Sequence, residues 1–597
     1  MPMPPRIDLP LRASIPTAGS RLHPNHMLHR HRFKFLFFSA LFGIDSRGQA
    51  PVPTAAFIAP MDIPLELAGN FMEPRSDHFH TGLDLRTQSR EGIPVRAVAD
   101  GWVSRIKISP FGYGKAVYID HADGHTTVYG HLQQLTGAVG SACLDQQYRR
   151  KDFSIDWTPE KGALPLKQGE VFALSGNTGG SGGPHLHFEV RRTSDQVALD
   201  PETFGMRVPD HLPPEILGVR LYALNDSSKL PPYPEKAVDY ATQGSGGRFT
   251  LKGKPLAYGT IGIAVNTIDR YDSGGAKCGV RSIEVLADSE ACFSALLDHV
   301  EFSHNRYCNA HMDYELSKGR KMDYHRCYRL PNNKLRIYGT EQAQGRIVLS
   351  PGEERAVLVI VTDANGNRSE LRFTLRGADA KEAGQWPMAE TLGSLFRYDA
   401  ANRIEEPGVR FLLPANALYD DAFVTYAGKP GPARSLSTAH AIGDPLVPLH
   451  AAADLSIAVS TNKPAKALIA RLDADGSVAA SVGGSWADGW ITAPVKSFGT
   501  YTVLLDTIPP VIANADLRSD IKGRKGFSLR IADNLSGIGS WQGTINGEWI
   551  LLEYDPKTKT LTHSFDKHTE GAGRKEFKLV VTDERGNPAS YKLEFAH

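Results

Sequence analysis

Two histidines separated by one residue, His185 and His187, lie where a glycine-rich stretch gives way to a strand-like run. The sequence from 177 to 191 reads NTGGSGGPHLHFEVR. Side chains two apart on a strand point to the same face, so both imidazoles should face one groove. One could bind a metal while the other stays free for proton transfer. Because neighbouring histidines are more often surface or packing residues, other parts of the chain must supply their partners.

A second group of this kind lies upstream, where residues 70–86 read NFMEPRSDHFHTGLDLR. His80 and Asp84 are four apart across a glycine, which lets the backbone bring an imidazole and a carboxylate to one point. Both are ordinary zinc ligands. With His187 they would supply two nitrogens and one oxygen and leave a fourth position open for water, as catalytic zinc requires. His78 is the alternative ligand, and a turn cap is the alternative role for Asp84.

Short β-strands must position these residues. No helical period competes with the alternating, strand-length runs that end at turn residues, which lie at 92–101, 102–108, 116–120 and 126–132. The last run contains TVYGHL and therefore places His131 at its end; a buried packing histidine is the alternative. The pattern predicts an antiparallel β domain over 51–208.

Two segments are expected to border the groove. The glycines ahead of His185 allow close backbone approach, so an extended peptide could pair with an edge strand there. A polar stretch at 140–163 interrupts the strand pattern, and a segment of this length is usually a lid, a binding loop or a small subdomain. We interpret it as a loop insertion beside the groove, with a featureless surface loop as the alternative.

Three signatures occur in order within about residues 60–205: HFHTGLD, TVYGHL and GNTGGSGGPHLHFEVR. This set resembles the zinc metallopeptidases of the lysostaphin and LytM type, many of which cut peptide cross-links of bacterial cell walls. The resemblance implies that His80, Asp84 and His187 hold one zinc ion. The stretch at 140–163 departs from the shortest members of the family, which leaves the substrate open.

The same resemblance implies that His131 and His185 are catalytic histidines that do not bind the metal. Such imidazoles could accept the proton of the attacking water and protonate the leaving amine, or stabilise the oxyanion as charged donors. Which of the two is the general base stays open. Glu189 lies two residues beyond His187 and shares its face, so it is either a hydrogen-bond partner of that ligand or a plain strand carboxylate.

Three further β-rich modules are predicted after this domain, at 209–376, 377–507 and 508–597. The first and last share a strand, an Asp-x-x-Gly-Asn turn and a second strand, and Asp272-Ser-Gly-Gly in one resembles Asp533-Asn-Leu-Ser-Gly in the other. This repeat resembles immunoglobulin-like β-sandwich modules. The middle module lacks this repeat. It begins near 378–395, where a short helix could form.

The first 50 residues are typical of targeting. Basic residues precede an apolar run at 35–44 that has the length of a signal-peptide core and is too short to span a bilayer. Met27 would give a more usual signal length, so 1–26 could reflect the choice of start site. A buried hydrophobic segment is the alternative. We expect a protein exported to the periplasm or cell envelope of a bacterium, without a transmembrane anchor.

The composition limits the classes of partner that the protein is expected to bind. The 67 Lys and Arg residues balance 66 Asp and Glu residues, which argues against a nucleic-acid partner. Four of the five cysteines lie close together in the sequence: Cys278, Cys292, Cys308 and Cys327. They could form two disulfides in any of three connectivities. A zinc knuckle is the alternative, although it fits their spacing less well.

The sequence therefore predicts an exported zinc endopeptidase that cuts peptidoglycan peptide bridges. The C-terminal modules would position it or bind a cell-envelope protein. The alternatives are a zinc endopeptidase acting on a protein, a catalytically inactive regulator or wall-binding protein of the same fold, and an adhesin built on the β modules. Inactive relatives typically lose ligands, so the complete set of ligands and histidines favours an enzyme.

Overall fold

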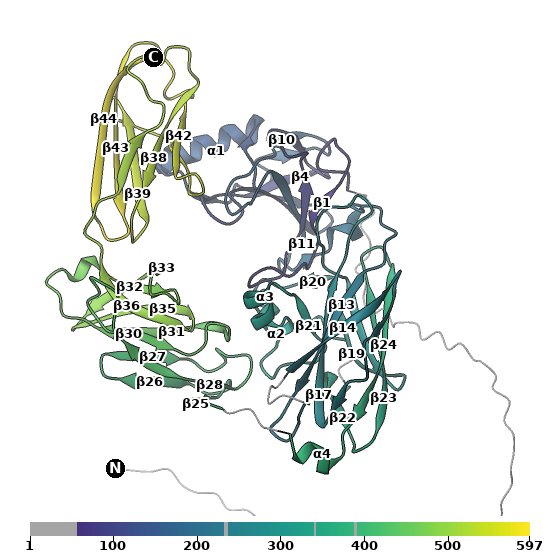
Figure 1. The fold of residues 1–597 in the computed structure, drawn as a ribbon. Helices are drawn as coiled ribbons and strands as arrows, with labels where there is room; N and C mark the ends of the chain where they lie inside the picture. Colours follow the sequence, from purple (N-terminus) through teal and green to yellow (C-terminus); the bar gives the residue numbers. More distant parts are fainter. Residues whose placement is uncertain (1–56, 232–236, 340–341, 387–390) are drawn as a thin grey trace, which may run out of the picture. The chain divides into compact units, whose positions relative to one another are not determined.

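The computed structural model describes residues 57–231, 237–339, 342–386 and 391–597. The predicted signal segment lies outside these ranges. The described residues form a mainly β protein, as the sequence predicts (Figure 1). None of their helices has the length and apolar character needed to cross a membrane.

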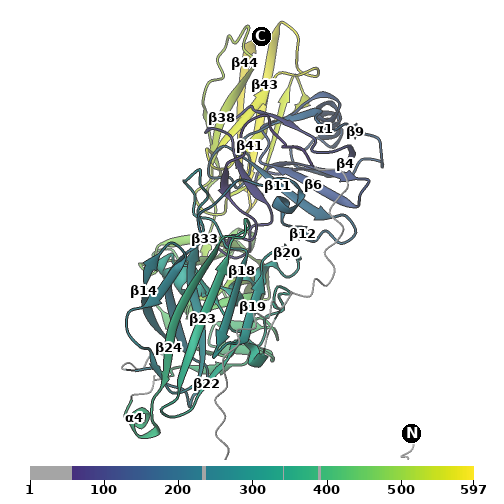
Figure 2. The same cartoon turned by 90° about the vertical axis from the view of Figure 1, so that its right-hand side faces the viewer.

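The N-terminal domain (57–208) is built on one antiparallel sheet in the order β1-β2-β11-β6-β5-β4-β8 and a smaller sheet in the order β3-β10-β7. Figure 2 shows β11 beside β6 in the larger sheet. The elements are β1 (Leu67–Gly69), β2 (Leu83–Arg86), β3 (Pro94–Arg96), β4 (Gly101–Ile108), β5 (Lys115–His121), β6 (His125–Gly130), β7 (Gln134–Leu135), α1 (Gly137–Arg150), β8 (Ile155–Trp157), β9 (Pro165–Leu166), β10 (Val171–Leu174), β11 (His185–Arg192), β12 (Ala198–Leu199) and η1 (Pro201–Phe204).

Three of the four predicted strands of this domain are confirmed as β4, β5 and β6. The run at 92–101 forms only the three-residue strand β3, because its second half turns before β4 begins. Val95, Ala97 and Val98 in this run are nevertheless fully buried. The run is therefore apolar because it packs into the core, although little of it pairs as a strand.

The prediction of a loop at 140–163 is wrong, because the helix α1 occupies its first half. The buried face of α1 consists of Val139, Cys143, Gln146 and Gln147. The side chain of Gln147 donates to the backbone oxygen of Phe153 at 2.7 Å, which satisfies one buried amide. A face half made of glutamines hides the helical period of apolar residues on which sequence-based detection depends.

The first module contains β13 to β24 and shares one hydrophobic core with the N-terminal domain. Its main sheet has the order β19-β18-β23-β24-β15-β14-β13-β17-β21. The elements are β13 (Glu215–Ala223), β14 (Ala237–Ser245), β15 (Arg248–Leu251), β16 (Leu256–Ala257), β17 (Gly259–Ile268), β18 (Ser282–Ala287), β19 (Glu290–Leu296), β20 (His299–Val300), η2 (Asn305–Tyr307), α2 (Cys308–His311), α3 (Tyr314–Arg320), β21 (Tyr324–Arg326), η3 (Gln342–Gly345), β22 (Ile347–Leu349), β23 (Glu354–Thr362) and β24 (Arg368–Gly377).

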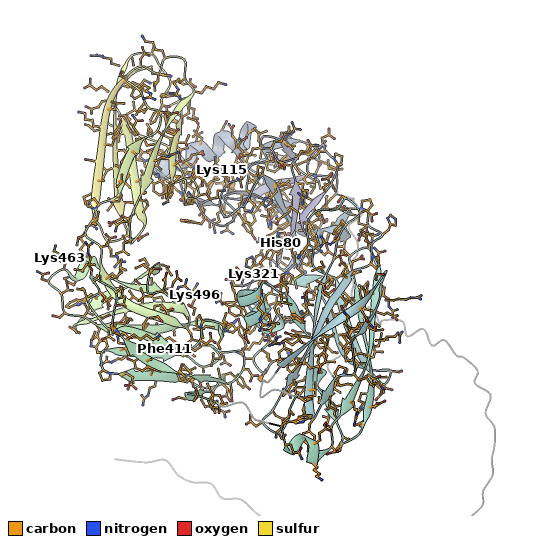
Figure 3. The ribbon with its side chains drawn as sticks, in the orientation of Figure 1. His80, Lys115, Lys321, Phe411, Lys463 and Lys496 are labelled. Carbon is orange, nitrogen blue, oxygen red and sulfur yellow. The ribbon has the colours of Figure 1, made fainter. Side chains whose placement is uncertain are left out.

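The second module follows the short helix α4 (Ala380–Gly384), which confirms the helix expected at 378–395. Its two five-stranded sheets enclose a core in which Phe411 is fully buried (Figure 3). The strands are β25 (Ser394–Phe396), β26 (Asn402–Glu406), β27 (Val409–Leu413), β28 (Ala422–Val424), β29 (Tyr426–Lys429), β30 (Ala439–Ile442), β31 (Pro448–Ala458), β32 (Ala467–Leu472), β33 (Val478–Gly483), β34 (Ser485–Ala487), β35 (Trp490–Ser497) and β36 (Gly499–Leu505), with η4 (Pro464–Lys466) between β31 and β32.

The third module has two four-stranded sheets around one core, in the orders β37-β38-β42-β41 and β40-β39-β43-β44. The strands are β37 (Val511–Asn514), β38 (Gly526–Ala532), β39 (Ile538–Ile545), β40 (Glu548–Ile550), β41 (Glu553–Asp555), β42 (Thr560–Ser564), β43 (Arg574–Asp583) and β44 (Pro588–Ala596). The repeated pair of strands around an Asp-x-x-Gly-Asn turn is β23-β24 in the first module and β43-β44 in the third. The immunoglobulin-like type of these modules stays a prediction.

The cysteines expected to pair as disulfides are all free thiols in the structure. Cys278, Cys308 and Cys327 are buried in the core, where burial raises the pKa of each thiol. The partly buried thiol of Cys292 lies 3.3 Å from the backbone oxygen of Val285. These cysteines therefore pack as small apolar side chains, and their closeness in sequence does not bring their sulfurs together.

Candidate active site

The pairing of β2 with β11 sets the geometry of the site. In this antiparallel register His187 lies directly opposite Asp84, and on its other side β11 pairs with β6, where Gly130 faces His187. Gly82 permits the close approach of β2, because a Cβ there would collide with the backbone oxygen of Phe188. The sheet thereby brings residues about 100 positions apart in sequence to one point.

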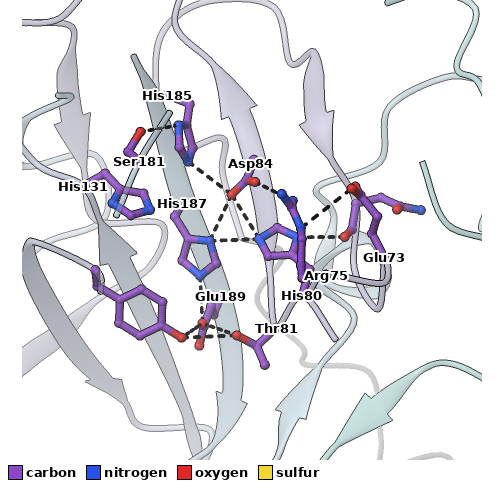
Figure 4. A network of polar contacts seen from close by, with 12 residues as sticks. Glu73, Arg75, His80, Thr81, Asp84, His131, Ser181, His185, His187 and Glu189 are labelled. Carbon is purple, nitrogen blue, oxygen red and sulfur yellow. Dashed lines mark hydrogen bonds and ion pairs between the residues drawn. The ribbon is translucent and has the colours of Figure 1, made fainter. Parts of the chain in front are cut away.

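His80, Asp84 and His187 converge on that point (Figure 4). The Nε2 atom of His80 and the Nδ1 atom of His187 each lie 3.0 Å from Oδ1 of Asp84, and the two nitrogens lie 3.0 Å from each other. All three residues are buried. This group could hold a metal ion, and its two nitrogens and one oxygen are the donors that zinc takes in catalytic sites.

The remaining ring nitrogen of each histidine is already engaged. The Nδ1–H of His80 donates to the backbone oxygen of Asn70 at 2.8 Å, and the Nε2–H of His187 donates to Oε1 of Glu189 at 2.8 Å. Each hydrogen bond places a proton on the far side of the ring, so the nitrogen that faces Asp84 is the one that a metal would bind. The donor set therefore fits a zinc ion, and Glu189 is a hydrogen-bond partner of the candidate ligand.

Glu189 is a fully buried carboxylate held by three further groups. Its Oε1 accepts from the hydroxyls of Thr81 at 2.6 Å and Tyr113 at 2.5 Å, and its Oε2 accepts from the guanidinium of Arg191 at 2.6 Å. Burial alone would raise the pKa of Glu189, but Arg191 and His187 outweigh it and hold the pKa well below its usual value. The carboxylate thus stays charged and accepts the His187 proton.

Arg75 is a member of the site that the sequence analysis did not identify. Its guanidinium donates to Oδ2 of Asp84 at 2.8 Å, so the two oxygens of Asp84 face different partners. Burial acts to raise the pKa of Asp84, but the imidazoles of His80, His185 and His187 hold it far below its usual value. Because Arg75 orients the charged carboxylate through Oδ2, its Oδ1 is free to bind a cation.

His131 and His185 border the three candidate ligands without joining them, and their ring centroids lie 4.7 Å apart. Nδ1 of His131 lies 2.8 Å from the backbone oxygen of Thr178, and Nδ1 of His185 lies 2.9 Å from that of Gly183. Carbonyl oxygens only accept, so His131 carries its proton on Nδ1 and presents Nε2 to the site, whereas Nε2 of His185 lies 3.3 Å from Oδ1 of Asp84. The glycine-rich loop supplies both carbonyls, a role that the sequence analysis did not assign to it.

The conformation of His131 also points to a constrained site. Its φ of 58° lies in the left-handed region, which is uncommon for residues other than glycine and tends to occur at functional positions. Burial, together with His187 and His185, lowers the pKa of His131 to about 3. At neutral pH this imidazole is uncharged and able to accept a proton.

With this geometry described, comparison with known protein families assigns the domain. Residues 78–143, which include His80, Asp84 and His131, match the model of peptidase family M23. The chain contains an M23 peptidase domain. A second family model, the Zu5-like domain, matches residues 393–506, which correspond to the second module.

Relatives of known name share the M23 domain. The DD-carboxypeptidase/endopeptidase Mpg of Neisseria meningitidis is 34% identical over 131 residues, which are 22% of this chain and 24% of that protein. The murein hydrolase activator EnvC of Escherichia coli is 31% identical over 113 residues, which are 19% of this chain and 21% of EnvC. The chain thus matches less than a quarter of the length of either relative.

Among solved structures, the catalytic domain of the antimicrobial peptidase lysostaphin from Staphylococcus simulans is similar to the M23 domain. The identity is 26%, the match covers 23% of this chain and 87% of that chain, and the TM-score is 0.18.

His78, the alternative ligand, lies outside the convergent group of the M23 domain. Its Nδ1 lies 2.8 Å from Oδ1 of Asp77, and half of its side chain is exposed. His78 lies in the bend between the bridged residues Pro74 and Phe79, and this bend leaves its side chain at the surface.

The loop that carries His80 is fastened by the first module, which the sequence analysis did not anticipate. The side-chain amide of Asn305 accepts from the backbone N–H of Phe79 at 2.6 Å and donates to the backbone oxygen of Phe79 at 2.9 Å. In the opposite direction, the side-chain amide of Asn70 makes the same pair of bonds with the backbone of Gly279, at 2.7 and 2.8 Å. The first module thus helps to position one edge of the M23 site.

Proposed function

We propose that this protein is an exported zinc endopeptidase that hydrolyses amide bonds in the peptide cross-links of peptidoglycan. The observation that carries the proposal is the convergence of His80, Asp84 and His187 beside two histidines that do not join them. The intact group argues against an inactive regulator, because an inactive protein has no need to keep both the metal donors and the proton-transfer groups.

In this proposal His80, Asp84 and His187 hold the zinc ion. When bound, zinc polarises the scissile carbonyl and lowers the pKa of a water molecule from about 15.7 toward about 7. The N–H groups on the far sides of the two ligand imidazoles stay bonded to Asn70 and Glu189, which fixes the orientation of both rings.

His131 and His185 then handle the protons of the reaction. Each presents Nε2 to the site because a backbone carbonyl holds its Nδ1–H. An uncharged imidazole can accept the proton of the attacking water and afterwards donate a proton to the leaving amine. We assign the roles of proton acceptor and of donor to the developing oxyanion to His131 and His185 as a pair.

Peptidoglycan is the proposed substrate because of the names of the relatives. Mpg is named a DD-carboxypeptidase/endopeptidase and EnvC a murein hydrolase activator, and both are similar to this chain within the M23 domain. Peptidoglycan lies outside the cytoplasm, which agrees with the proposed export. The second and third modules would position the enzyme or bind a protein of the cell envelope.

Two variants of the full chain test the proposal by zinc analysis and by digestion of purified peptidoglycan. His185→Ala should retain zinc and lose cleavage, because this histidine touches the reacting groups and not the metal. His187→Ala should lose zinc and cleavage together. His78→Ala is the matched control and should change neither.

Other results would contradict specific parts of the proposed function. Zinc at the wild-type level in His187→Ala refutes the assignment of the ligand. Unchanged cleavage in His185→Ala refutes its catalytic role. A wild-type protein that binds zinc without cutting peptidoglycan, but that stimulates another hydrolase, would instead be a regulator.

A further inference from the structure

Two clusters of three aspartates lie outside the M23 site, one in the first module and one in the third. In each cluster one carboxylate oxygen per residue lies within 4.8 Å of the other two. The first cluster consists of Asp210, Asp269 and Asp363, and the second consists of Asp506, Asp533 and Asp583. Among the residues that the structure describes, no Lys, Arg or His side chain forms an ion pair with any of these six, so each cluster concentrates negative charge without a protein cation to balance it.

The first member of each cluster lies in the segment that enters the module. Asp210 and Asp506 each begin an Asp-x-x-Pro-Pro sequence. In both, Oδ1 accepts the backbone N–H two residues further on, from Leu212 at 3.1 Å and from Ile508 at 3.3 Å. The prolines stiffen the chain after this turn. The two entering segments therefore present a carboxylate in the same way.

The third member opens the Asp-x-x-Gly-Asn turn. Asp363 accepts the Nδ2–H of Asn367 at 2.9 Å, and Asp583 accepts that of Asn587 at 2.7 Å. The same amide nitrogens also lie 3.2 Å from the backbone oxygen of Asp210 and 3.1 Å from that of Asp506. In both modules one asparagine thus joins the turn to the entering segment, so the repeat seen in the sequence builds the same cluster twice.

The second member follows directly after a strand that pairs with the first strand of its module. Asp269 follows β17, which pairs with β13, and Asp533 follows β38, which pairs with β37. The structure therefore matches Asp269 to Asp533, in place of the match between Asp272 and Asp533 that the sequence repeat indicated. Asp272 is exposed and pairs with His211 at 2.7 Å.

Asp269 has a buried carboxylate that no other group in the cluster compensates. It is 1% exposed, and neither of its carboxylate oxygens has a hydrogen-bond partner. In the third module Oδ1 of Asp533 is likewise buried without a partner. A buried carboxylate without compensation is strongly unfavourable, so a positive charge or a proton must accompany it. A proton on Asp269 would still leave the two neighbouring carboxylates without a cation.

We propose that each cluster binds one calcium ion, which ties the segment entering the module to the two loops that carry the other aspartates. All the donors are oxygens, which hard cations prefer, and calcium accepts six to eight oxygens in flexible geometry, including water and backbone carbonyls. Apart from Asp269, the carboxylates accept hydrogen bonds from backbone N–H groups and from the two asparagines, which orient them without using all of their lone pairs. The entering segments are also the joints to the preceding parts of the chain, so calcium would stiffen these joints.

The experiment uses the full chain, stripped of metal by chelator and dialysis, and titrates it with calcium chloride up to about 10 mM, a range that covers extracellular calcium modules. The wild type should bind two ions and its Tm should rise by a few degrees. Asp269→Asn should bind one ion, Asp533→Asn should bind one, and the double variant none. Asp272→Asn and Glu584→Gln remove a nearby carboxylate outside each cluster and should keep both ions.

Two readouts separate this site from the M23 site and from a folding defect. His187→Ala should still bind two calcium ions, so the proposal stands or falls independently of the proposed peptidase activity. In calcium-free buffer Asp269→Asn should have a Tm at least as high as that of the wild type, because the substitution relieves repulsion between carboxylates. A wild type that binds no calcium, unchanged stoichiometry in both single variants, or a lower calcium-free Tm in Asp269→Asn would each overturn the proposal.

Discussion

The Nε2 atom of His187 lies 2.8 Å from Oε1 of Glu189, two residues further along the same strand. Strand alternation places both side chains on one face, so the candidate ligand and the carboxylate that orients it are specified within three residues. This hydrogen bond helps to raise the pKa of His187 to about 9, because burial, which would lower it, is outweighed by Asp84 and Glu189.

Replacement of Glu189 by glutamine should weaken metal binding by about 10- to 100-fold, the usual effect of losing a partner of a ligand histidine. The reason is that a neutral amide is a poorer acceptor for the His187 proton. Competition with a chromophoric zinc chelator measures the affinity. Glu170→Gln alters an exposed carboxyl group of the same domain and should leave it unchanged. Equal affinities for wild type and Glu189→Gln would show that this carboxylate does not orient the ligand.

His131→Ala should lower the rate of peptidoglycan cleavage by about 10²- to 10⁴-fold, the range for loss of a general acid or base. Its zinc content should equal that of the wild type, because His131 lies beside the three candidate ligands and is not one of them. Metal analysis and a cleavage assay on the same sample check both parts. Loss of zinc in this variant would instead mark His131 as a ligand.

Asn305→Ala should destabilise the fold by about 1–3 kcal/mol, since it leaves the buried backbone N–H and C=O of Phe79 without partners. It should also weaken zinc binding, because Phe79 precedes the candidate ligand His80. Urea unfolding and the chelator competition measure the two effects. Lys252→Ala, at an exposed position of the same module, should affect neither. A destabilised variant with full zinc affinity would show that the first module supports folding only.

The stability of the protein should fall as the pH rises from about 4.5 to about 8, and Glu202 should contribute to this dependence. Burial and the neighbouring Asp200 raise the pKa of Glu202 to about 8, and its Oε2 accepts from the hydroxyl of Tyr271 at 2.9 Å. In this window the folded protein keeps a proton that the unfolded chain has lost. Each pH unit therefore lowers the free energy of unfolding by up to about 1.4 kcal/mol.

Glu202→Gln should show a smaller loss of stability between about pH 5 and about pH 7.5, as measured by urea unfolding at the two values. Glu160→Gln, at an exposed position of the same domain, should keep the wild-type dependence. An identical slope in Glu202→Gln would mean that the carboxyl group of Glu202 is not protonated in the folded state.

The candidate ligands could be named from the sequence because their spacing is local. The HxxxD spacing of His80 and Asp84 and the alternation of His185 and His187 each lie within one short segment, and the resemblance to a known family joined the two. The strands β4, β5 and β6 were likewise evident from strand-length apolar runs that end at turn residues, although β5 and β6 are buried on both faces. Where a buried face carried glutamines, as in α1, the same method failed.

The repeat in the sequence identified two related modules but matched the wrong aspartate in the first. Asp272 lies in a glycine-containing turn that resembles the turn after Asp533, whereas the carboxylate that faces the cluster belongs to Asp269. Only the strand pairing shows which aspartate follows the equivalent strand. The burial that leaves both oxygens of Asp269 without partners also depends on the complete module.

The sequence by itself predicted the candidate donors of the M23 site and the two histidines beside them, and it determined the mainly β architecture, because residue type and local periodicity carry that information. The tertiary structure alone decided which groups hold those donors in place. Arg75 reaches Asp84, Asn305 holds the backbone beside His80, and two loop carbonyls orient the rings of His131 and His185. These contacts depend on the close approach of segments that are mostly distant in the chain, and no local spacing encodes such an approach.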